Sequence, residues 1–319
     1  MQFKIAAFYE FNYISDLELL SKSLKLFCKR KKLMGSVIIA SEGINGTIAG
    51  FPSFIDEFID QLAMLGFHHL NIKYSQSPTM PFYRSKVKIK KEIVTFHDKP
   101  TNFKTNRAES IKAKNWNNFV NQTDVLTIDV RNEYEVKIGS FKNSISPKTK
   151  SFVEFKDYVE TELLANKDQK IAMYCTGGIR CEKASSYMKN IGFNNVFQLD
   201  GGILKYLEEI DDKDSLWDGE CFVFDNRVTL TKDLVKGTYD LCRGCNEPIS
   251  QYDQKSQKFE KDVSCPTCYD TVSEEKKSRS RERSKQIKLS KQRGIPNIYL
   301  PQSVEDHVEG YNKRKNLDD

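Results

Sequence analysis

The pattern of apolar and polar positions changes twice along the chain. In the first 98 residues, short apolar runs alternate with segments in which apolar residues recur every three or four positions. Short apolar runs predict strands, and the longer spacing predicts helices with one buried face. From about residue 125 the apolar runs become continuous, and beyond about residue 215 they give way to a cysteine-rich and then a basic segment. We therefore treat the chain as three successive regions.

Residues 1–98 predict the order strand, helix, strand, strand, helix, strand. Ser15 forms a capping box with Glu18 at the start of the first helix, and Ser53 caps the second. Residues 41–46 have the composition of a turn. The expected strands cover residues 3–11, 35–40, 47–49, 71–76 and 87–96. This split β-α-β order predicts a ferredoxin-like, or acylphosphatase-like, domain.

Residues 123–215 predict a different architecture. Residues 125–130 and 171–174 are apolar throughout, with helical patterns between and after them. Strands that alternate with helices indicate a parallel sheet covered by helices on its faces. Residues 99–122, which include a helix near Trp116, are expected to connect this α/β domain to the first one.

Composition bounds the class of protein. At about 100–200 residues per domain, 319 residues correspond to two or three domains, and we find no internal repeat. The mean hydropathy is −0.58, and no stretch approaches the ~20 apolar residues of a membrane helix. The first dozen residues contain acidic and polar side chains, unlike a signal peptide. We expect a cytoplasmic protein without a membrane partner.

Eight cysteines are present, and in a reducing cytosol clustered cysteines indicate metal ligands or reactive thiols. Cys242 and Cys245 form one CxxC pair, and Cys265 and Cys268 form a second after nineteen residues. Four thiolates at this spacing predict a structural Zn²⁺ site in a module over residues 216–275. The alternatives are a redox dithiol or unrelated thiols. Cys28 and Cys221 are expected to be core residues.

Cys175 follows the apolar strand 171–174 and precedes a helix. Backbone N–H groups and the positive end of the helix dipole stabilise a thiolate at such a position. Glycines let the amides approach the sulfur, and Arg180 can add a fixed positive charge. The intervening loop residues are Thr176, Gly177, Gly178 and Ile179. We expect a reactive thiolate that is open to ligand, rather than an inert buried cysteine.

Neighbouring residues have weaker assignments. Cys181, expected as the first residue of the helix, either resolves an oxidised Cys175 or simply packs. Asp129, Arg131 and Glu135 lie at the end of a strand and in the following turn, where ion pairs usually support a loop. We expect these three to hold the active loop in place.

The positive charge of the chain is concentrated in one segment. The net charge is +6, yet residues 276–293 alone hold nine basic residues and one acid, so the remainder is close to neutral. Such a run is either a solvated helix face or a phosphate-binding surface, and we expect the tail 276–319 to bind RNA. The RNA-binding candidates in it are Arg279, Arg281, Arg283, Lys285, Lys288, Lys291 and Arg293.

A second basic strip lies on the expected strand near residue 87. Alternation places Lys86, Lys88 and Lys90 on one face, with Phe82 and Tyr83 beside them. Lysines and aromatics together suit single-stranded nucleotides, although an edge strand protected by lysine has the same pattern.

Several of these motifs resemble known families. The sequence Asp129-Val-Arg131, the Cys175-to-Arg180 loop and residues 196–202 look like a rhodanese-homology domain. Residues 41–47, 86–94 and 217–225, with the paired CxxC motifs, are similar to the rhodanese-family tRNA uridine hydroxylases across nearly the whole chain. The resemblance implies oxygen-dependent hydroxylation at C5 of uridine 34, in the anticodon stem-loop, with molecular oxygen as cosubstrate. Cys175 matches the active cysteine, which rhodaneses use as a persulfide carrier.

Chemistry alone would order the possibilities differently. The four histidines form no 2-His-1-carboxylate candidate, and no flavin or NAD fingerprint is present. From chemistry alone, sulfur transfer through a Cys175 persulfide therefore ranks first. Beside the resemblance it becomes the second enzymatic hypothesis, and an RNA-binding scaffold is the non-enzymatic one. A phosphatase is disfavoured because four residues, not five, separate Cys175 from Arg180.

Overall fold

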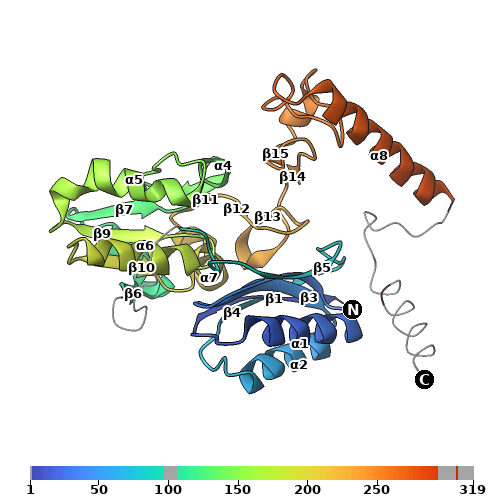
Figure 1. Cartoon of the computed structure of the whole chain (residues 1–319). Helices are drawn as coiled ribbons and strands as arrows, with labels where there is room; N and C mark the ends of the chain where they lie inside the picture. The colour runs from blue at the N-terminus through green and yellow to red at the C-terminus, as the bar shows by residue number, and fades with distance from the viewer. Residues whose placement is uncertain (1, 97–106, 294–306, 308–319) are drawn as a thin grey trace.

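Three bodies make up the protein in the computed structural model, which describes residues 2–96, 107–293 and 307. Figure 1 shows the N-terminal sheet with its two helices at the bottom, the parallel sheet at the left, and the cysteine module with a long helix at the upper right. The expected segments 99–122 and 276–319 lie partly outside the described residues.

The N-terminal domain is a five-stranded sheet of order β4-β1-β3-β2-β5. All neighbours are antiparallel except β5, which runs parallel to β2 at the edge. The predicted ferredoxin-like fold is confirmed, with β5 as an addition. The strands are β1 (Phe3–Phe11), β2 (Met34–Ala40), β3 (Gly43–Gly50), β4 (Asn71–Ser77) and β5 (Ser85–Ile89).

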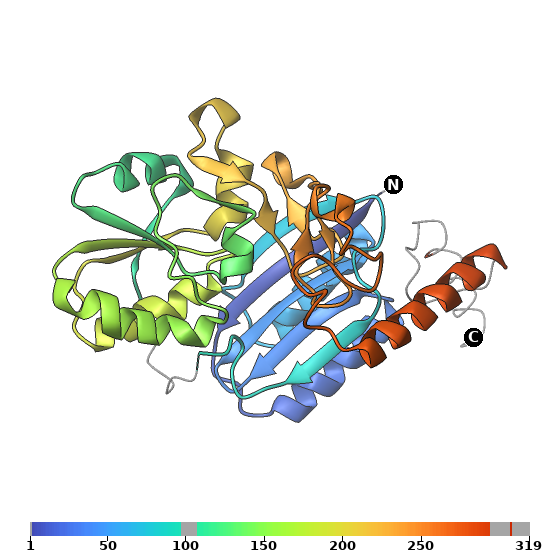
Figure 2. The same cartoon turned by 90° about the horizontal axis from the view of Figure 1, so that it is seen from above.

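Two helices, α1 (Leu17–Arg30) and α2 (Pro52–Met64), cover one face of this sheet. Leu24 and Phe58 pack there against Phe8, and Cys28 is buried in the same core, as expected. Successive side chains of a strand point to opposite faces. The opposite face, which carries Tyr9 and Lys73, is therefore turned toward the rest of the chain (Figure 2).

Local details of this domain differ from the sequence prediction. The cap of α1 is Asp16, not Ser15, and its carboxylate accepts the Leu19 N–H at 2.8 Å. The cap of α2 is Phe51 without a side-chain bond, since Pro52 fits the first helical turn by its fixed φ and Ser53 already lies inside the helix. β3 begins at Gly43 because the turn is shorter than predicted, and β5 ends at Ile89 rather than at residue 96.

The second domain has a four-stranded parallel sheet of order β6-β10-β9-β7. This confirms the predicted parallel α/β architecture. Its strands are β6 (Glu109–Ile111), β7 (Val125–Asp129), β9 (Lys170–Tyr174) and β10 (Val196–Leu199). Its helices are α3 (Ala113–Val120), α4 (Glu133–Val136), α5 (Phe155–Tyr158, continued by a π-helical turn, Val159–Leu163), α6 (Ile179–Asn190) and α7 (Gly202–Glu209).

The boundary between the two domains lies earlier than the sequence suggested. Phe96 stacks on Phe152 in the core of the parallel domain, with ring centroids 4.4 Å apart. β6 and α3, which we expected in a connecting segment, belong to the same domain, and Trp116 of α3 is fully buried. A three-residue edge strand has too few apolar residues to be recognised by its pattern.

The first part of the third region, which precedes its four clustered cysteines, packs on the parallel domain. β11 (Trp217–Gly219) pairs with β8 (Gly139–Phe141), and Cys221 of β12 (Cys221–Phe222) is buried against that domain, as its core assignment predicted. The remaining elements are β13 (Thr229–Leu230), β14 (Asp240–Leu241), β15 (Pro248–Ile249) and α8 (Glu274–Gln292). Within the described residues no helix combines the length and apolar character needed to span a membrane.

Candidate active site and cysteine cluster

Cys175 lies where β9 turns into α6, as predicted. Its Sγ accepts the backbone N–H of Gly178 at 3.1 Å. The carbonyl oxygens of Cys175 and Thr176 accept N–H groups from the first turn of α7, at 3.0 and 3.1 Å. The loop is therefore held between the N-termini of two helices, and the dipoles of both favour negative charge there.

Two glycines are required by this geometry. Gly178 caps α6 with φ +103°, and a Cβ on it would lie 2.9 Å from the Tyr9 hydroxyl of the N-terminal domain. Gly202 opens α7 with φ +68°, and a Cβ on it would lie 2.5 Å from the Cys175 carbonyl oxygen. Only a residue without a side chain allows both close approaches.

The environment of Cys175 favours its thiolate. Burial alone would raise the pKa of Cys175, but a hydrogen bond from Cys181, the charge of Arg180 and the backbone N–H groups lower it to about 5. Burial and the neighbouring Cys175 charge raise the pKa of Cys181 well above its usual value. These opposite pKa shifts favour a thiolate at Cys175 and a neutral thiol at Cys181. Cys181 is the third residue of α6, not the first as we predicted.

Arg180 is oriented by a carboxylate from another element. Its guanidinium forms a bidentate pair with Glu135 of α4 at 2.6 and 2.8 Å and also donates to the Thr176 hydroxyl at 3.2 Å. Glu135 has no exposed surface, and Arg180 is 7% exposed. Burial would raise the pKa of Glu135, but the charge of Arg180 keeps it below its usual value. Glu135 and Thr176 therefore hold the Arg180 guanidinium beside the loop.

Asp129 and Arg131 form a second buried pair behind the first. Arg131 donates to both Asp129 carboxylate oxygens at 2.9 and 2.6 Å, and to the Gly139 carbonyl at 2.6 Å. Both side chains are fully buried, and neither lines the cavity that borders Cys175. The structure brings together the loop, Arg180 and Glu135, and puts this second pair underneath them.

A cleft of about 640 Å³ separates the loop from the open face of the N-terminal sheet. Cys175, Gly177 and Arg180 line one side of it, and Tyr9 and Lys73 line the other. Against our expectation of an accessible thiol, the Cys175 side chain has no exposed surface, because the loop folds closely around the sulfur. The cleft nevertheless reaches it, so the thiolate borders a space large enough for a nucleotide-sized ligand.

Sequence reasoning missed the residues that the N-terminal domain contributes to this cleft. The Tyr9 hydroxyl closely approaches Gly178 of the Cys175 loop, and Lys183 of α6 forms a buried ion pair with Glu42 of the N-terminal domain at 2.8 Å. Glu42 lies within residues 41–47, which carried part of the resemblance, and this was the one available signal. Tyr9 and Lys73 occupy ordinary alternating positions of strands, so nothing in their local sequence marks them.

The four cysteines of the C-terminal module converge as their spacing predicted. The Sγ atoms of Cys242, Cys245, Cys265 and Cys268 all lie within 4.8 Å of one another. The Cys242–Cys268 and Cys245–Cys265 separations are 3.7 Å, and Cys265–Cys268 is 3.8 Å. Ligands at ~2.3 Å around a tetrahedral metal lie about 3.8 Å apart. The cluster therefore fits a metal ion with four thiolate ligands and no open position.

The basic residues of α8 divide into two groups. Arg281 forms a bidentate pair with Glu260 at 2.7 Å, so this side chain holds the helix on the cysteine module. Near the start of the helix, Lys277 is buried over the Tyr269 ring and Lys276 donates to the Gly244 carbonyl. The remaining cations are exposed on a helix that extends away from the body in Figure 1. They are Arg279, Arg283, Lys285, Lys288 and Lys291, followed by Arg293 at the helix end. Lys86 and Lys88 are exposed on edge strand β5, and Lys90 follows it.

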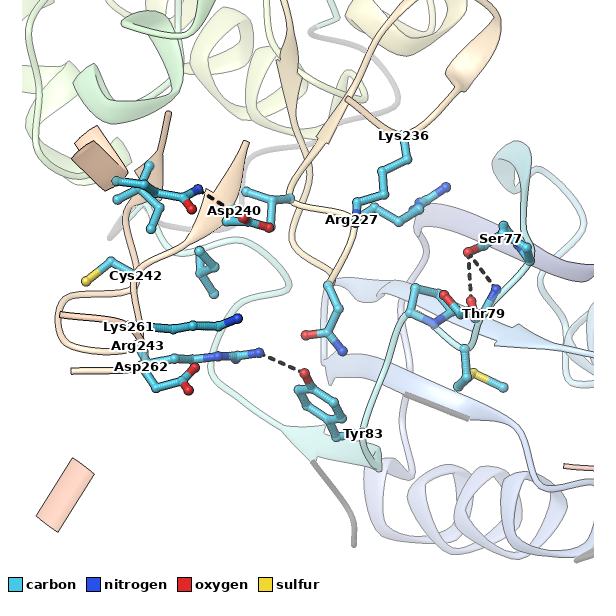
Figure 3. A pocket seen from close by; sticks show the side chains of 18 of the residues that line it. Ser77, Thr79, Tyr83, Arg227, Lys236, Asp240, Cys242, Arg243, Lys261 and Asp262 are labelled. Atoms are coloured by element: carbon cyan, nitrogen blue, oxygen red, sulfur yellow. Dashed lines mark hydrogen bonds between the residues drawn. The ribbon is translucent and has the colours of Figure 1, made fainter. Parts of the chain in front are cut away.

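A second cavity, of about 1070 Å³, separates the N-terminal domain from the cysteine module. In Figure 3, Arg243 points toward Tyr83 and donates to its hydroxyl at 2.7 Å. Tyr83, which we expected beside the basic strip, thus joins the two domains. Five acidic and five basic residues line this cavity, so it lacks the excess of positive charge that phosphate binding requires.

A buried thiolate on a loop between a parallel strand and a helix defines a rhodanese-like site, and family models agree. The UPF0176 acylphosphatase-like domain matches residues 3–93, and the rhodanese-like domain matches residues 112–209. A tRNA uridine(34) hydroxylase from Teredinibacter turnerae is 44% identical over 291 residues, which cover 91% of each chain. The chain belongs to this hydroxylase family.

Two solved structures each match about a third of this chain. A rhodanese-related protein from Thermoplasma volcanium is 25% identical, with 31% of this chain and 90% of that chain covered and a TM-score of 0.25. A rhodanese-like domain protein from Staphylococcus aureus is 23% identical, with 31% and 90% covered and a TM-score of 0.26.

Proposed function

We propose that this protein hydroxylates uridine 34 of tRNA at C5, with molecular oxygen as cosubstrate. The observation that carries the proposal is the 44% identity to a tRNA uridine(34) hydroxylase over 91% of both chains. The cleft is consistent with it, because a nucleotide-sized space borders a stabilised thiolate. A cytoplasmic location, where tRNA is modified, follows from the proposed activity.

Within this proposal Cys175 is the residue that reacts with substrate, as thiolate or persulfide. Arg180 and the N–H of Gly178 hold the negative charge on its sulfur, and Glu135 positions Arg180. Thr176 to Ile179 form the loop, and Cys181 keeps the charge on Cys175 by its hydrogen bond. Asp129 and Arg131 support the loop from below. Each role rests on the contacts of this chain.

The metal that we propose for the four-cysteine cluster is Zn²⁺. A set of four thiolates at tetrahedral separations suits zinc, and without an open coordination position the ion would be structural. It would join the two CxxC turns, from which α8 is positioned by Arg281 and by Lys276, whose ammonium donates to the Gly244 carbonyl at 2.8 Å.

The surface that we propose for tRNA includes the exposed cations of α8 and of the β5 edge. Phosphate contacts from such residues position RNA without reading its sequence. The anticodon nucleotide would then be selected in the cleft.

Mass spectrometry of tRNA nucleosides from a deletion strain tests the function. Loss of a uridine derivative 16 Da heavier than uridine is the expected result, and complementation with the intact gene should restore it. Loss of a thiolated nucleoside instead would establish the sulfurtransferase alternative. An unchanged nucleoside profile would leave only an RNA-binding scaffold and would refute the proposal.

A further inference from the structure

Two buried lysines lie near the cleft, and their surroundings differ. Lys183 of α6 is 3% exposed and pairs with Glu42 at 2.8 Å and with Glu92 at 3.5 Å. Lys73 of β4 is 9% exposed, yet no carboxylate among the described residues lies within ion-pair distance of it. Its ammonium donates to the Asn71 side chain and lies 5.6 Å from the centroid of the Tyr9 ring.

The carboxylates nearest to Lys73 already have other partners. Asp200 pairs with Lys205 at 2.8 Å, and Glu182 accepts a hydrogen bond from Gln198 at 3.1 Å and pairs with Arg107 at 3.7 Å. Burial lowers the pKa of Lys73 to about 8, and the charge of the Cys175 thiolate counteracts that effect. An unpaired buried ammonium is costly for a fold, so its presence calls for a ligand.

The position of Lys73 shows where such a ligand would lie. Lys73 and Cys175 line the same cleft from opposite sides, one from the N-terminal sheet and one from the parallel domain. The two arginines of that cleft are neutralised, Arg180 by Glu135 and Arg227 by Asp225 at 2.6 Å, and its other lysine, Lys90, is exposed. Lys73 is thus the buried cation in the described part of the cleft that has no anionic partner.

We propose that Lys73 binds an anionic oxygen of the nucleotide that reacts at Cys175, so that the N-terminal domain completes the active site. The nucleotide rests on the proposed function, whereas the anion site does not. The oxygen belongs either to the phosphodiester or to the base, where negative charge develops as a nucleophile adds to the ring. In both cases the ammonium contacts substrate across the cleft from the thiolate.

Alkylation of Cys175 tests the anion site without any assumption about the reaction. Iodoacetate is an anion and iodoacetamide is its neutral analogue, and the rate ratio at Cys175 at pH 7 can be read by peptide mass spectrometry. Lys73→Met should lower the iodoacetate-to-iodoacetamide ratio about 5-fold or more, the effect of one nearby charge in a partly buried site. Lys73→Arg should retain most of the preference. Lys22→Met, which removes an exposed lysine of α1 in the same domain, is the matched control and should not alter it.

Thermal unfolding separates this role from a structural one. Lys73→Met should leave Tm unchanged or raise it, because no carboxylate loses its partner, whereas Lys183→Met should lower it. An unchanged alkylation ratio in Lys73→Met would overturn the proposal, whether or not its Tm is lowered.

Hydroxylation kinetics then identify the oxygen. A raised KM with kcat retained in Lys73→Met assigns the phosphodiester, and a lowered kcat at saturating tRNA assigns the base. Wild-type kinetics in Lys73→Met would refute a substrate contact. If the wild-type protein does not hydroxylate tRNA at all, the proposed function fails, and the alkylation ratio still decides the anion site.

Discussion

The Cys175 loop and the four-cysteine cluster use the same side chain in opposite ways. In the loop, one sulfur is surrounded by hydrogen-bond donors and a fixed cation, and a cleft reaches it. In the cluster, four sulfurs face one another at about the separations of a tetrahedral metal site, and no position is left open. Under the proposed function the loop keeps its sulfur available for reaction, whereas a metal ion in the cluster would cross-link the two CxxC turns.

The difference lies in what stabilises the thiolate. At Cys175 the stabilising groups are hydrogen-bond donors and a fixed charge, which leave the sulfur without a metal bond and able to react with a substrate. In a metal cluster those lone pairs would be occupied by the ion itself. A cysteine is therefore assigned by its neighbours, and substitutions in the two regions should separate activity from stability.

The largest effect is expected from Cys175→Ala. Product formation should fall by at least about 1000-fold, since removal of a nucleophile leaves only binding effects. Steady-state hydroxylation of tRNA measures this loss, and a thermal melt checks that the fold is retained. Cys28→Ala, an equally buried cysteine in the N-terminal core, is the control and should keep activity. Near-normal turnover by Cys175→Ala would remove Cys175 from the reaction.

Removal of the metal should affect the other region. Protein prepared without chelator should contain about one zinc per chain, and Cys242→Ser should lose it and unfold the C-terminal module, because metal binding and folding are coupled. Elemental analysis and limited proteolysis provide the measurements, while the alkylation rate of Cys175 should stay unchanged. Absence of zinc, or iron–sulfur absorbance, would contradict the assignment.

Arg180→Ala should affect both reactivity and stability within the loop region. Loss of its charge should raise the pKa of Cys175 above about 5, because Arg180 stabilises the thiolate. The thiolate then forms only at higher pH, and the pH midpoint of alkylation shifts upward. It also leaves Glu135 buried and unpaired, at a cost of about 3–5 kcal/mol. Iodoacetamide rates across pH and urea unfolding report the two effects.

A double variant separates these two effects. Arg180→Ala with Glu135→Gln removes the unpaired carboxylate, so stability should largely return while the Cys175 midpoint stays high. Recovery of the wild-type midpoint in the double variant would show that Arg180 does not act on the thiolate.

The smallest effect concerns the helix that extends from the cluster. Replacement of Arg279, Arg283, Lys285 and Lys288 by Gln should weaken tRNA binding and reduce the slope of log K against log salt by up to about 3, at ~0.7–0.9 per phosphate contact. The matched control replaces Lys22, Lys25, Lys29 and Arg30, four exposed cations of α1. Equal slopes in the two variants would make α8 an ordinary solvated helix.

In both regions the chemistry of the cysteines could be predicted from the local sequence. The CxxC pairs are local, so spacing alone predicted that Cys242 and Cys265 would meet. The strand-to-helix position of Cys175 was equally local. Cap residues were harder, since Asp16 and Ser15 are both capable acceptors and only the backbone path selects Asp16. The short strand β6 was missed because its edge position demands little hydrophobicity.

The sequence by itself determined the three regions, the two fold classes, the thiolate loop and the cysteine cluster, because periodicity, glycine placement and residue spacing act over short distances along the chain. Only the tertiary structure paired Arg180 with Glu135 and brought Lys73 and Tyr9 to the cleft opposite Cys175. Those contacts depend on how two domains pack. A strand lysine has the same local pattern whether its face meets solvent or a second domain, so its role was decided by packing.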